Sequence, residues 1–378
     1  MQRKNKEKSK NFKRKRGKPS VLFNNKNGRS FLVIEKKLFF GDGVLNMLLR
    51  EMYEQEEHQR LSKYAAFSDE SKGRTTPEEE SDMRTVYQRD RDRIIHSKSF
   101  RRLKHKTQVF LAPYGDHYRT RLTHTLEVSQ IARTIAKALR CNEELTEAIA
   151  LAHDIGHTPF GHVGERALTS VSGKNFQHNE HGVRVVEFLE KNGEGLNLTW
   201  EVKDGILNHK TSLTPATLEG DIVRISDKIA YISHDIDDGI RAGVLSEDTL
   251  PKNITKILGH STRDRLDMMI HNVIDNSADS PRAKMSEECW NALMELRQYM
   301  FDMLYTNPVV KKEETKAYEI IRILYERFMD NPDQIPDEFK KEDLDLSTAV
   351  TDYIACMTDN YAVQQFQNIY IPQSWSSY

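Results

Sequence analysis

Apolar side chains recur at steps of three or four residues along most of this chain, which is the pattern of amphipathic helices. The stripe over residues 122–139 contains aliphatic side chains and His124, so a histidine is expected on a buried helix face. Few segments alternate apolar and polar side chains, as strands do. The pattern therefore predicts an all-α fold.

A second helix is expected to begin just after Asn142, whose side chain can cap it, with Glu143 and Glu144 suited to the positive helix start. Its buried face includes His153, and Gly156 with the nearby proline ends it. The helix is thus expected to deliver His153 and its neighbour Asp154 at its C-terminal end.

A third helix is predicted over about residues 220–238, with a stripe of isoleucines on one face. On a second face, roughly opposite, lie Asp227, Tyr231 and Asp235, each four residues from the next. These side chains are candidates for chemistry because carboxylates and a phenol are gathered along one line of the helix.

The N-terminal segment differs in composition from the rest of the chain. The first thirty residues contain twelve Lys or Arg and a single acid, Glu7, so residues 1–44 are expected to be a basic, disordered extension. A helix is predicted over about residues 45–64, and charged loops over 68–82 and 330–343. One folded region over residues 45–378 is predicted, with a core at about 119–240 and a helical C-terminal part at 241–378.

Bulk composition narrows the class of protein. The chain has 378 residues with a net charge of −1. Cys141, Cys289 and Cys356 lie far apart, which favours a reducing compartment and argues against a thiolate metal site. No apolar run approaches the roughly 20 residues of a membrane span. The basic start also lacks the apolar segment of a secretory signal, so a cytoplasmic protein is expected.

His124, His153, Asp154 and Asp227 form the main candidate site. Neutral imidazole nitrogens and carboxylates suit a divalent ion of the manganese, magnesium, iron, zinc or nickel class. A single histidine on an apolar stripe is more often a hydrogen-bonded core residue. However, His157 and His162 follow closely, and burying so much polarity costs several kcal/mol unless a metal or ligand satisfies it. The cluster as a whole therefore indicates a metal site.

Two further pairs of side chains point to phosphate chemistry. Arg121 lies one helical turn before His124 and can grip phosphate oxygens, and Lys228 can supply a second cation, although either could equally form a surface salt bridge. His162 and Glu165 are three residues apart and can form a proton-transfer pair, unless the glutamate contacts the backbone of the helix start.

Longer sequence motifs carry a family resemblance. The motifs are RDRDRIIHSKSFRRLKHKTQVF at 89–110, GDHYRTRLTH at 115–124, HDIGHTPFGH at 153–162, HDIDD at 234–238 and DYIACMTDNY at 352–361. The order His, His-Asp, Asp within them and at Asp227 is similar to that of the HD-domain metallophosphohydrolases. The motifs together resemble the bacterial deoxyguanosinetriphosphate triphosphohydrolase-like proteins, a family akin to the animal dNTP triphosphohydrolases, over about residues 50–378.

The resemblance implies an HD-type helical core with a C-terminal helical extension, and metal-dependent hydrolysis of deoxynucleoside triphosphates to deoxynucleoside plus inorganic triphosphate. It also implies a homo-oligomer. The implied roles are metal binding by His124, His153, Asp154 and Asp227, proton transfer by His162 and Glu165, phosphate contacts by Arg121, His157, His178 and Lys228, and deoxyribose contacts by Gln108, Tyr231 and Asp235. The chain departs from the family pattern at His181, Cys356 and Asn360, where glutamine, glycine and arginine are expected.

Two alternatives stay open at this point. The first is another HD-type nucleotide phosphohydrolase, although the chain lacks the His-Asp-x-x-Glu-Asp motif of alarmone hydrolases and the Gly-Tyr-Pro motif of cyclic-dinucleotide esterases. The second is a nucleotide-sensing, nucleic-acid-binding regulator, since the basic N-terminal segment favours salt-sensitive affinity for single-stranded nucleic acid. The sequence does not decide the preferred base, or whether His162 acts as acid or base.

Overall fold

The computed structural model describes residues 48–108, 118–340 and 344–372, with the side chains of 309 and 310 excepted, and four short strands nearer the N-terminus. The chain divides into two units, residues 1–48 and 49–378. In the first unit, two antiparallel pairs are described: β1 (Leu22–Asn24) with β2 (Ser30–Leu32), and β3 (Leu38–Phe40) with β4 (Gly43–Leu45). The expected disorder of residues 1–44 falls mostly on residues outside those described.

The second unit is built from helices, as predicted, so the all-α fold class is confirmed. The first half contains α1 (Leu49–Arg60), α2 (Val86–Ile95), α3 (Lys98–Arg102), α4 (Arg121–Ala138), α5 (Glu143–Ala152), α6 (His162–Ser172), α7 (His178–Arg184) and α8 (Trp200–Asn208). The second half contains α9 (Leu218–Arg241), α10 (Lys252–Leu258), α11 (Thr262–Ser277), α12 (Glu287–Met300), α13 (Pro308–Asp330), α14 (Leu346–Ala355) and α15 (Asp359–Tyr370). Short 3₁₀ or π segments lie between them. The 3₁₀ segments are η1 (Ser68–Glu70), η2 (Leu103–His105), η4 (Glu190–Gly193), η5 (Glu247–Thr249), η7 (Pro332–Gln334) and η8 (Asp337–Phe339), and the π segments are η3 (Val185–Leu189) and η6 (Phe301–Tyr305).

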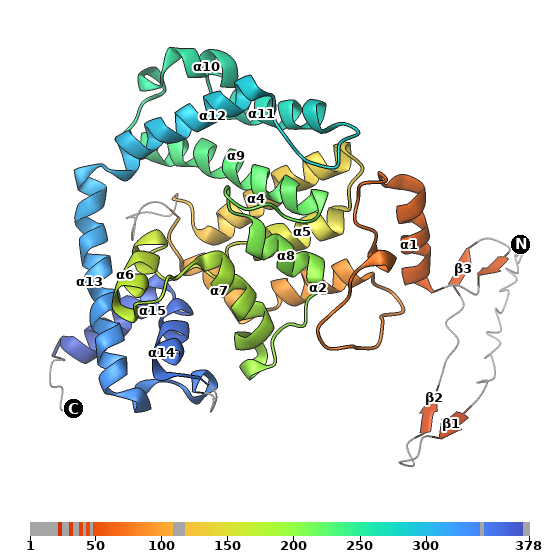
Figure 1. The fold of residues 1–378 in the computed structure, drawn as a ribbon, viewed down its shortest axis with the longest axis horizontal. Coiled ribbons are helices and arrows are strands. Elements are labelled where there is room, and N and C mark those ends of the chain that lie inside the picture. The colour runs from red at the N-terminus through yellow and green to blue at the C-terminus, as the bar shows by residue number, and fades with distance from the viewer. Residues whose placement is uncertain are drawn as a thin grey trace, which may run out of the picture. The chain divides into compact units, whose positions relative to one another are not determined.

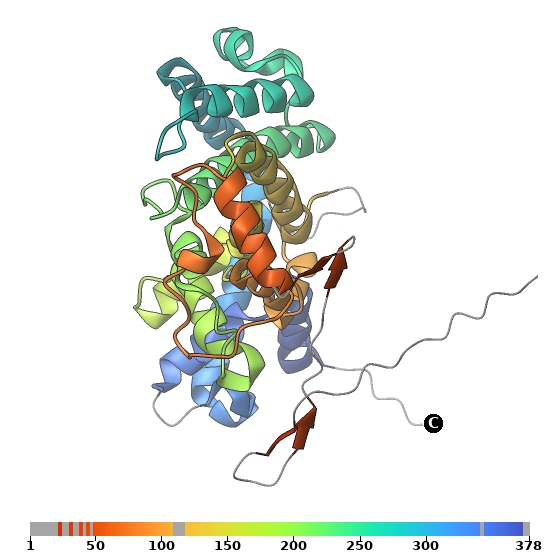
Figure 2. The same cartoon turned by 90° about the vertical axis from the view of Figure 1, so that its right-hand side faces the viewer.

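Helices α4, α5 and α9 pack against one another at the centre of this unit, with α2 and α8 beside them (Figure 1). The stripes read from the sequence face inward: Val128, Ile149 and Ile229 have no exposed surface. Helices α10–α12 stack beyond α9 at one end (Figures 1 and 2), and α13 leads from there past α6 to α14 and α15. This arrangement brings the C-terminal end of α5 into the middle of the unit.

Capping residues set the ends of the central helices. Thr120 accepts from the Thr123 N–H at the start of α4, and Asn142 accepts from the N–H groups of Glu144 and Leu145 at the start of α5. The helix predicted over residues 45–64 is shorter than expected. It ends at Arg60 because the Ser62 N–H donates to a carbonyl oxygen next to α4, that of Arg140, at 2.7 Å.

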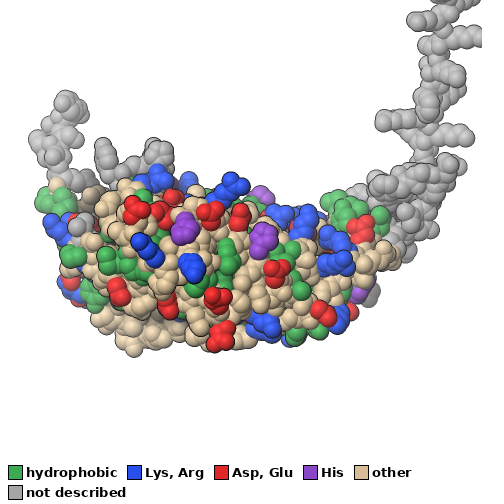
Figure 3. All heavy atoms as spheres, turned by 90° about the horizontal axis from the view of Figure 1, so that it is seen from above, with side chains coloured by type: hydrophobic (Ala, Val, Ile, Leu, Met, Phe, Trp, Pro, Cys, Tyr) green, Lys and Arg blue, Asp and Glu red, His purple; other side chains and the backbone are tan. Residues whose placement is uncertain are grey.

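The surface of the helical unit is mixed in charge. On the face that Figure 3 shows, basic and acidic side chains are interspersed, as expected for a chain with 56 Lys or Arg and 57 Asp or Glu. Among the helices described, none combines the length and the apolar character that crossing a membrane would require. The distinctive chemistry of this unit lies instead in its buried histidines.

Candidate functional site

The C-terminal end of α5 places His153 and Asp154 between α4 and α9. The Nε2 atom of His124 on α4 lies 3.1 Å from Oδ1 of Asp227 on α9. The Nε2 atom of His153 lies 3.5 Å from Asp154 Oδ1 and 3.7 Å from Asp227 Oδ1. The structure thus brings together the four side chains for which metal binding is predicted.

The chemistry of these donors fits a divalent ion. His153 has no exposed surface, and its Nδ1–H donates to the carbonyl oxygen of Ala150 at 2.7 Å. The other ring nitrogen, Nε2, makes no hydrogen bond within the described part of the chain. Burial opposes ionisation of Asp227, but the His124 and His153 rings hold the pKa of that carboxyl below its ordinary value. A buried imidazole nitrogen with no hydrogen bond within the described residues, beside an ionised carboxylate, suits a metal ligand set.

Arg121 and His157 flank the Asp154 carboxylate. The Nη1 group of Arg121 donates to Asp154 Oδ2 at 2.7 Å, and His157 Nε2 lies 3.1 Å from Asp154 Oδ1. Burial disfavours the charged carboxylate, yet His153, His157 and Arg121 together keep the pKa of Asp154 well below its ordinary value. The Arg121 Nε atom makes no hydrogen bond within the described residues, so the guanidinium can accept a further anionic partner.

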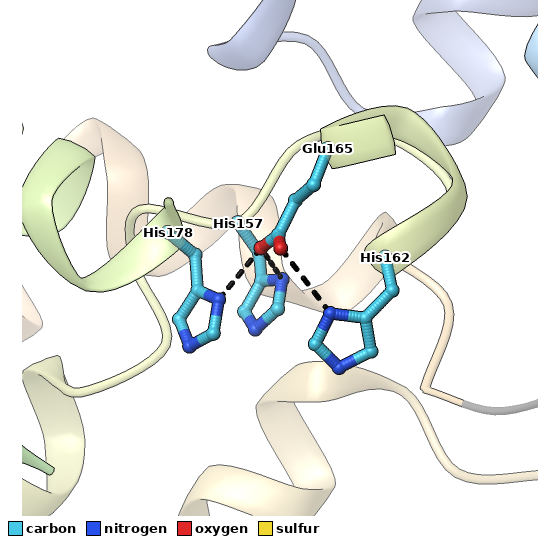
Figure 4. Close-up of side chains that lie close together, drawn as sticks. All are labelled: His157, His162, Glu165 and His178. Carbon is cyan, nitrogen blue, oxygen red and sulfur yellow. Dashed lines mark hydrogen bonds and ion pairs between the residues drawn. The ribbon is translucent and has the colours of Figure 1, made fainter. Parts of the chain in front are cut away.

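Three histidines surround Glu165 (Figure 4). His178 Nδ1 lies 2.6 Å from Glu165 Oε1, His157 Nδ1 lies 3.4 Å from the same oxygen, and His162 Nδ1 lies 3.3 Å from Oε2. The His162 side chain is 68% exposed, whereas that of Glu165 is 13% exposed. The predicted contact between His162 and Glu165 is therefore present. The His162 ring is open to solvent, and the Glu165 carboxylate also contacts two buried imidazoles.

Glycine permits the close approach that places His178. A Cβ atom at Gly156 would lie 2.1 Å from the carbonyl oxygen of His178 and 2.2 Å from the backbone nitrogen of Gly182. Only a residue without a side chain lets the turn after α5 touch the start of α7 in this way. Gly156 thus allows His178 to lie close to His153 and Asp154.

The predicted sugar-binding side chains lie along α9 and beside it. Asp235 is buried, and burial raises the pKa of its carboxyl to about 7. The hydroxyl of Tyr305, on η6, donates a short hydrogen bond to Asp235 Oδ2. Tyr231 is half-buried on the same helix, and Gln108 is half-buried next to residues that are not described. These positions are compatible with the predicted roles and do not test them.

Lys228 is more deeply buried than a solvated helix position would be. Its side chain is 1% exposed, with Nζ 5.8 Å from the centre of the Trp290 ring, and burial lowers the pKa of its ammonium group to about 8. A residue in a surface salt bridge would be exposed, so this alternative interpretation of Lys228 does not fit its burial.

Sequence reasoning missed His209, which follows α8. Its side chain is 3% exposed, and its Nε2 lies 3.1 Å from Nε2 of His178. The signal was available: Val202, Ile206 and His209 share one helical stripe, as His124 shares one on α4. Tyr305 was missed because nothing near it in the sequence marks it as a partner of Asp235.

Comparison with known proteins agrees with this geometry. The HD domain model matches residues 121–232, and the phosphohydrolase-associated domain model matches residues 283–368. The helical core and its histidine–aspartate cluster therefore define an HD-domain phosphohydrolase.

Relatives at high identity define the family. Three relatives are named deoxyguanosinetriphosphate triphosphohydrolase-like protein. That from Caldanaerobacter subterraneus subsp. tengcongensis is 56% identical, covering 87% of this chain and 98% of its own. Those from Clostridium perfringens and Desulfatibacillum aliphaticivorans are 50% and 46% identical, each covering 86% of this chain and 99% of its own. This chain belongs to the deoxyguanosinetriphosphate triphosphohydrolase-like family.

A solved structure of a hypothetical protein from Aquifex aeolicus overlaps 74% of this chain and 71% of its own, at 18% identity and a TM-score of 0.46. That overlap is too limited to support any statement about this chain.

Proposed function

We propose that this protein hydrolyses deoxynucleoside triphosphates to a deoxynucleoside and inorganic triphosphate, using a divalent metal ion held by His124, His153, Asp154 and Asp227. The observation that carries the proposal is the convergence of these four side chains near the buried Nε2 of His153, which makes no hydrogen bond within the described residues. The names of the relatives support a nucleoside triphosphate as substrate.

Charge neutralisation is the first task of the site, because a triphosphate repels an attacking hydroxide. A divalent ion, when bound, supplies Lewis acidity that polarises a phosphoryl oxygen and acidifies water. Arg121 is placed to offset further charge, since its guanidinium is buried beside Asp154 and keeps unused donors. We assign His157 and Lys228 to the same task.

Proton transfer is assigned to His162 and Glu165. Hydrolysis at the α-phosphorus forms a bond to the water oxygen and breaks the bond to the nucleoside 5′-oxygen, which must gain a proton as it leaves. The exposed His162 ring, held by Glu165 at 3.3 Å, can exchange protons with solvent between turnovers. Either abstraction of the water proton or donation to the leaving oxygen fits this position.

Recognition of the sugar is assigned to Gln108, Tyr231 and Asp235. Hydrogen bonds from a fixed carboxylate and a phenol to the 3′-hydroxyl would hold the deoxyribose close to the protein. A ribose 2′-hydroxyl would then clash with protein atoms, and ribonucleotides would be rejected. Tyr305 supports this role because its hydroxyl fixes the Asp235 carboxylate.

The test is direct. The full-length protein would be incubated with each dNTP and rNTP plus Mn²⁺ or Mg²⁺ in ¹⁸O-labelled water, and the products separated by ion exchange. We expect deoxynucleoside and triphosphate from dNTPs, with the label in the triphosphate. Release of dNMP plus pyrophosphate, or equal turnover of rNTPs, would contradict the proposal. Asp227→Asn serves as the control for a contaminating hydrolase.

Two other expectations remain proposals. A homo-oligomer is implied by the family resemblance. Affinity of the basic segment for single-stranded nucleic acid concerns residues that lie mostly outside those described. A salt-dependent binding assay with and without residues 1–44 would test it.

A further inference from the structure

Both oxygens of the Asp359 carboxylate, at the start of α15, accept hydrogen bonds from segments that carry site residues. Oδ1 accepts from the Phe160 N–H at 2.9 Å, and Oδ2 accepts from the Thr107 N–H at 2.9 Å and from the Thr107 hydroxyl. Phe160 lies 199 residues before Asp359, and Thr107 lies 252 residues before it. The buried Asp359 side chain thus joins three distant parts of the chain.

Capping of α15 does not account for this carboxylate. The helix is capped by Thr358, whose side chain accepts from the Tyr361 N–H. At the start of α14, by contrast, Asp345 is itself the cap and accepts from the N–H and the hydroxyl of Thr348, at 3.0 and 2.8 Å. Asp359 accepts from the same kinds of donor, but from segments outside its own helix.

The first of these segments is the turn that precedes His162. Phe160 has a φ of 61° and Gly161 has a φ of 56°, so two successive residues lie in the left-handed region. A bulky residue such as phenylalanine rarely adopts this conformation, which persists only where the surrounding structure holds it. The hydrogen bond from Phe160 to Asp359 is such a restraint, and it acts two residues before His162.

The same turn contacts Arg121. A Cβ atom at Gly161 would lie 2.8 Å from Arg121 Nη2, so the backbone of the turn packs directly against the guanidinium. The Val163 N–H donates to the Phe160 carbonyl oxygen at 3.2 Å, which joins the turn to the start of α6. Movement of the turn would therefore move His162 and change the packing of Arg121.

The second segment leads to Gln108. Thr107 forms an isolated antiparallel bridge with Thr120, the residue that caps α4. The segment thus lies between the start of α15 and the start of α4. Because Gln108 follows Thr107 directly, the hydrogen bonds from Thr107 to Asp359 also limit where the Gln108 side chain can reach.

Lys106 adds a second link between the site and the C-terminal helices. Its side chain is buried, and Nζ donates to the carbonyl oxygen of Ala355 at 3.0 Å and to that of His157. Ala355 is the last residue of α14, and His157 lies at the start of the loop that leads to α6. The loop before α6 is therefore linked to the C-terminal helices at both of its ends.

We propose that Asp359 is a positioning residue for the hydrolysis, which holds the turn before His162 and the segment before Gln108 in the geometry that the reaction needs. The proposal rests on the proposed function, because it concerns the same site. A carboxylate has two accepting oxygens and can serve both segments at once, whereas an amide has one. Small displacements matter here, since a shift of about 1 Å can lower a rate by about 100-fold.

The experiment compares Asp359→Asn with Asp345→Asn in the full-length protein loaded with Mn²⁺, with the four dNTPs as substrates. Asparagine at position 359 keeps one accepting oxygen and turns an N–H donor toward the other segment. We expect kcat to fall by about 100-fold in Asp359→Asn, with unchanged Mn²⁺ content. Asp345→Asn is the matched control, because Asp345 also accepts from the N–H and hydroxyl of a threonine, but within its own helix. Its kcat should match that of the wild type.

Thr107 allows a smaller change that tests the second segment by itself. Thr107→Val removes the hydroxyl donor at nearly constant shape, so KM for dNTPs should rise by roughly 2- to 12-fold while kcat stays near that of the wild type. Thr107→Ser keeps the hydroxyl and should show the wild-type KM. Equal KM values in the two variants would overturn the proposal, and this comparison holds even if Asp359→Asn does not fold.

Hydrogen exchange followed by mass spectrometry detects the positioning without any reaction. Peptides covering residues 104–108 and 157–165 should exchange faster in Asp359→Asn than in the wild type, and at wild-type rates in Asp345→Asn. A purely structural role would raise exchange throughout the helical unit and lower kcat equally in both variants. That result, or a wild-type kcat in folded Asp359→Asn, would overturn the proposal.

Failure of the proposed function would look different. A wild type that releases no triphosphate from dNTPs would contradict the proposed function, whereas hydrogen exchange would still show whether Asp359 fixes the two segments. A wild type that hydrolyses dNTPs, together with an equally active Asp359→Asn, would leave the proposed function intact and remove the positioning role. Product identification and hydrogen exchange therefore separate the two proposals.

Discussion

The two ends of α5 are both lined with buried polar side chains, yet they are built in opposite ways. At the N-terminal end, Asn142 caps the helix, donates to Glu57 Oε1 at 3.1 Å and to the Ala66 carbonyl at 3.0 Å, and its own N–H donates to Glu219 Oε1 at 2.9 Å. Glu57 also accepts from the N–H and hydroxyl of Ser68, both at 2.7 Å. The fold thus uses the Asn142 side chain and both Glu57 oxygens at this end, and leaves Glu219 Oε2 without a hydrogen bond among the described residues.

At the C-terminal end, several buried polar atoms have no hydrogen-bond partner among the described residues. His153 Nε2, His124 Nδ1 and Arg121 Nε make no hydrogen bond within the described residues. Unpaired buried polar groups cost stability. The comparison teaches that one end of α5 fixes the helix in place, whereas the other holds donors and lone pairs for something that binds.

Replacing one carboxylate at each end gives the largest contrast. We expect Asp227→Asn to lose bound metal and to lower dNTP hydrolysis by more than about 100-fold, since even changes behind a ligand typically cost 10–100-fold. Glu219→Gln should hydrolyse dNTPs near the wild-type rate. Metal content and initial rates measure both, and circular dichroism checks the helices. Full activity in folded Asp227→Asn would contradict the conclusion that the C-terminal end of α5 serves binding and catalysis while the N-terminal end is structural.

The next effect is on stability. Asn142→Ala removes the cap of α5 and leaves Glu57 and the Ala66 carbonyl short of a donor, which should lower the free energy of unfolding by roughly 2–4 kcal/mol. Hydrolysis by the protein that remains folded should be unchanged. Urea denaturation followed by circular dichroism measures the loss. A loss of activity without a loss of stability would mean that this end also serves the reaction.

A pH series sharpens the comparison further. Burial raises the pKa of Glu219 from 4.5 to about 7. The folded state therefore holds a proton that the unfolded state releases between these values, so this group's contribution to stability is greatest below pH 4.5 and declines until about pH 7. The stability of Glu219→Gln relative to the wild type should accordingly rise by roughly 1–3 kcal/mol from pH 5 to pH 8. Denaturation midpoints across this range test it, and a constant difference would contradict it.

The smallest expected effect concerns Tyr231, a predicted sugar-binding residue. Tyr231→Phe removes one neutral hydrogen bond, worth about 0.5–1.5 kcal/mol, so kcat/KM for dNTPs should fall by roughly 2- to 12-fold. Metal content should not change. A loss as large as that of Asp227→Asn would place Tyr231 among the groups that the metal or the reacting atoms require.

Local sequence determined the helices and the faces they bury, because helical periodicity and caps depend on residues three or four apart. It placed His124 on a buried stripe, Asn142 at the start of α5 and the His153–Asp154 pair at its end, and the structure agrees. The sequence motifs also carried the family, which the relatives confirm.

Only the tertiary structure decided which of these side chains meet. His124 and Asp227 are separated by 103 residues, and His178 and His209 by 31, and no local pattern states that their nitrogens and oxygens lie about 3 Å apart. Tyr305 reaches Asp235 across 70 residues for the same reason. Periodicity fixes which face of a helix is buried, but helix packing fixes what that face touches, and the pairing of lone pairs and protons at the site depends on that contact.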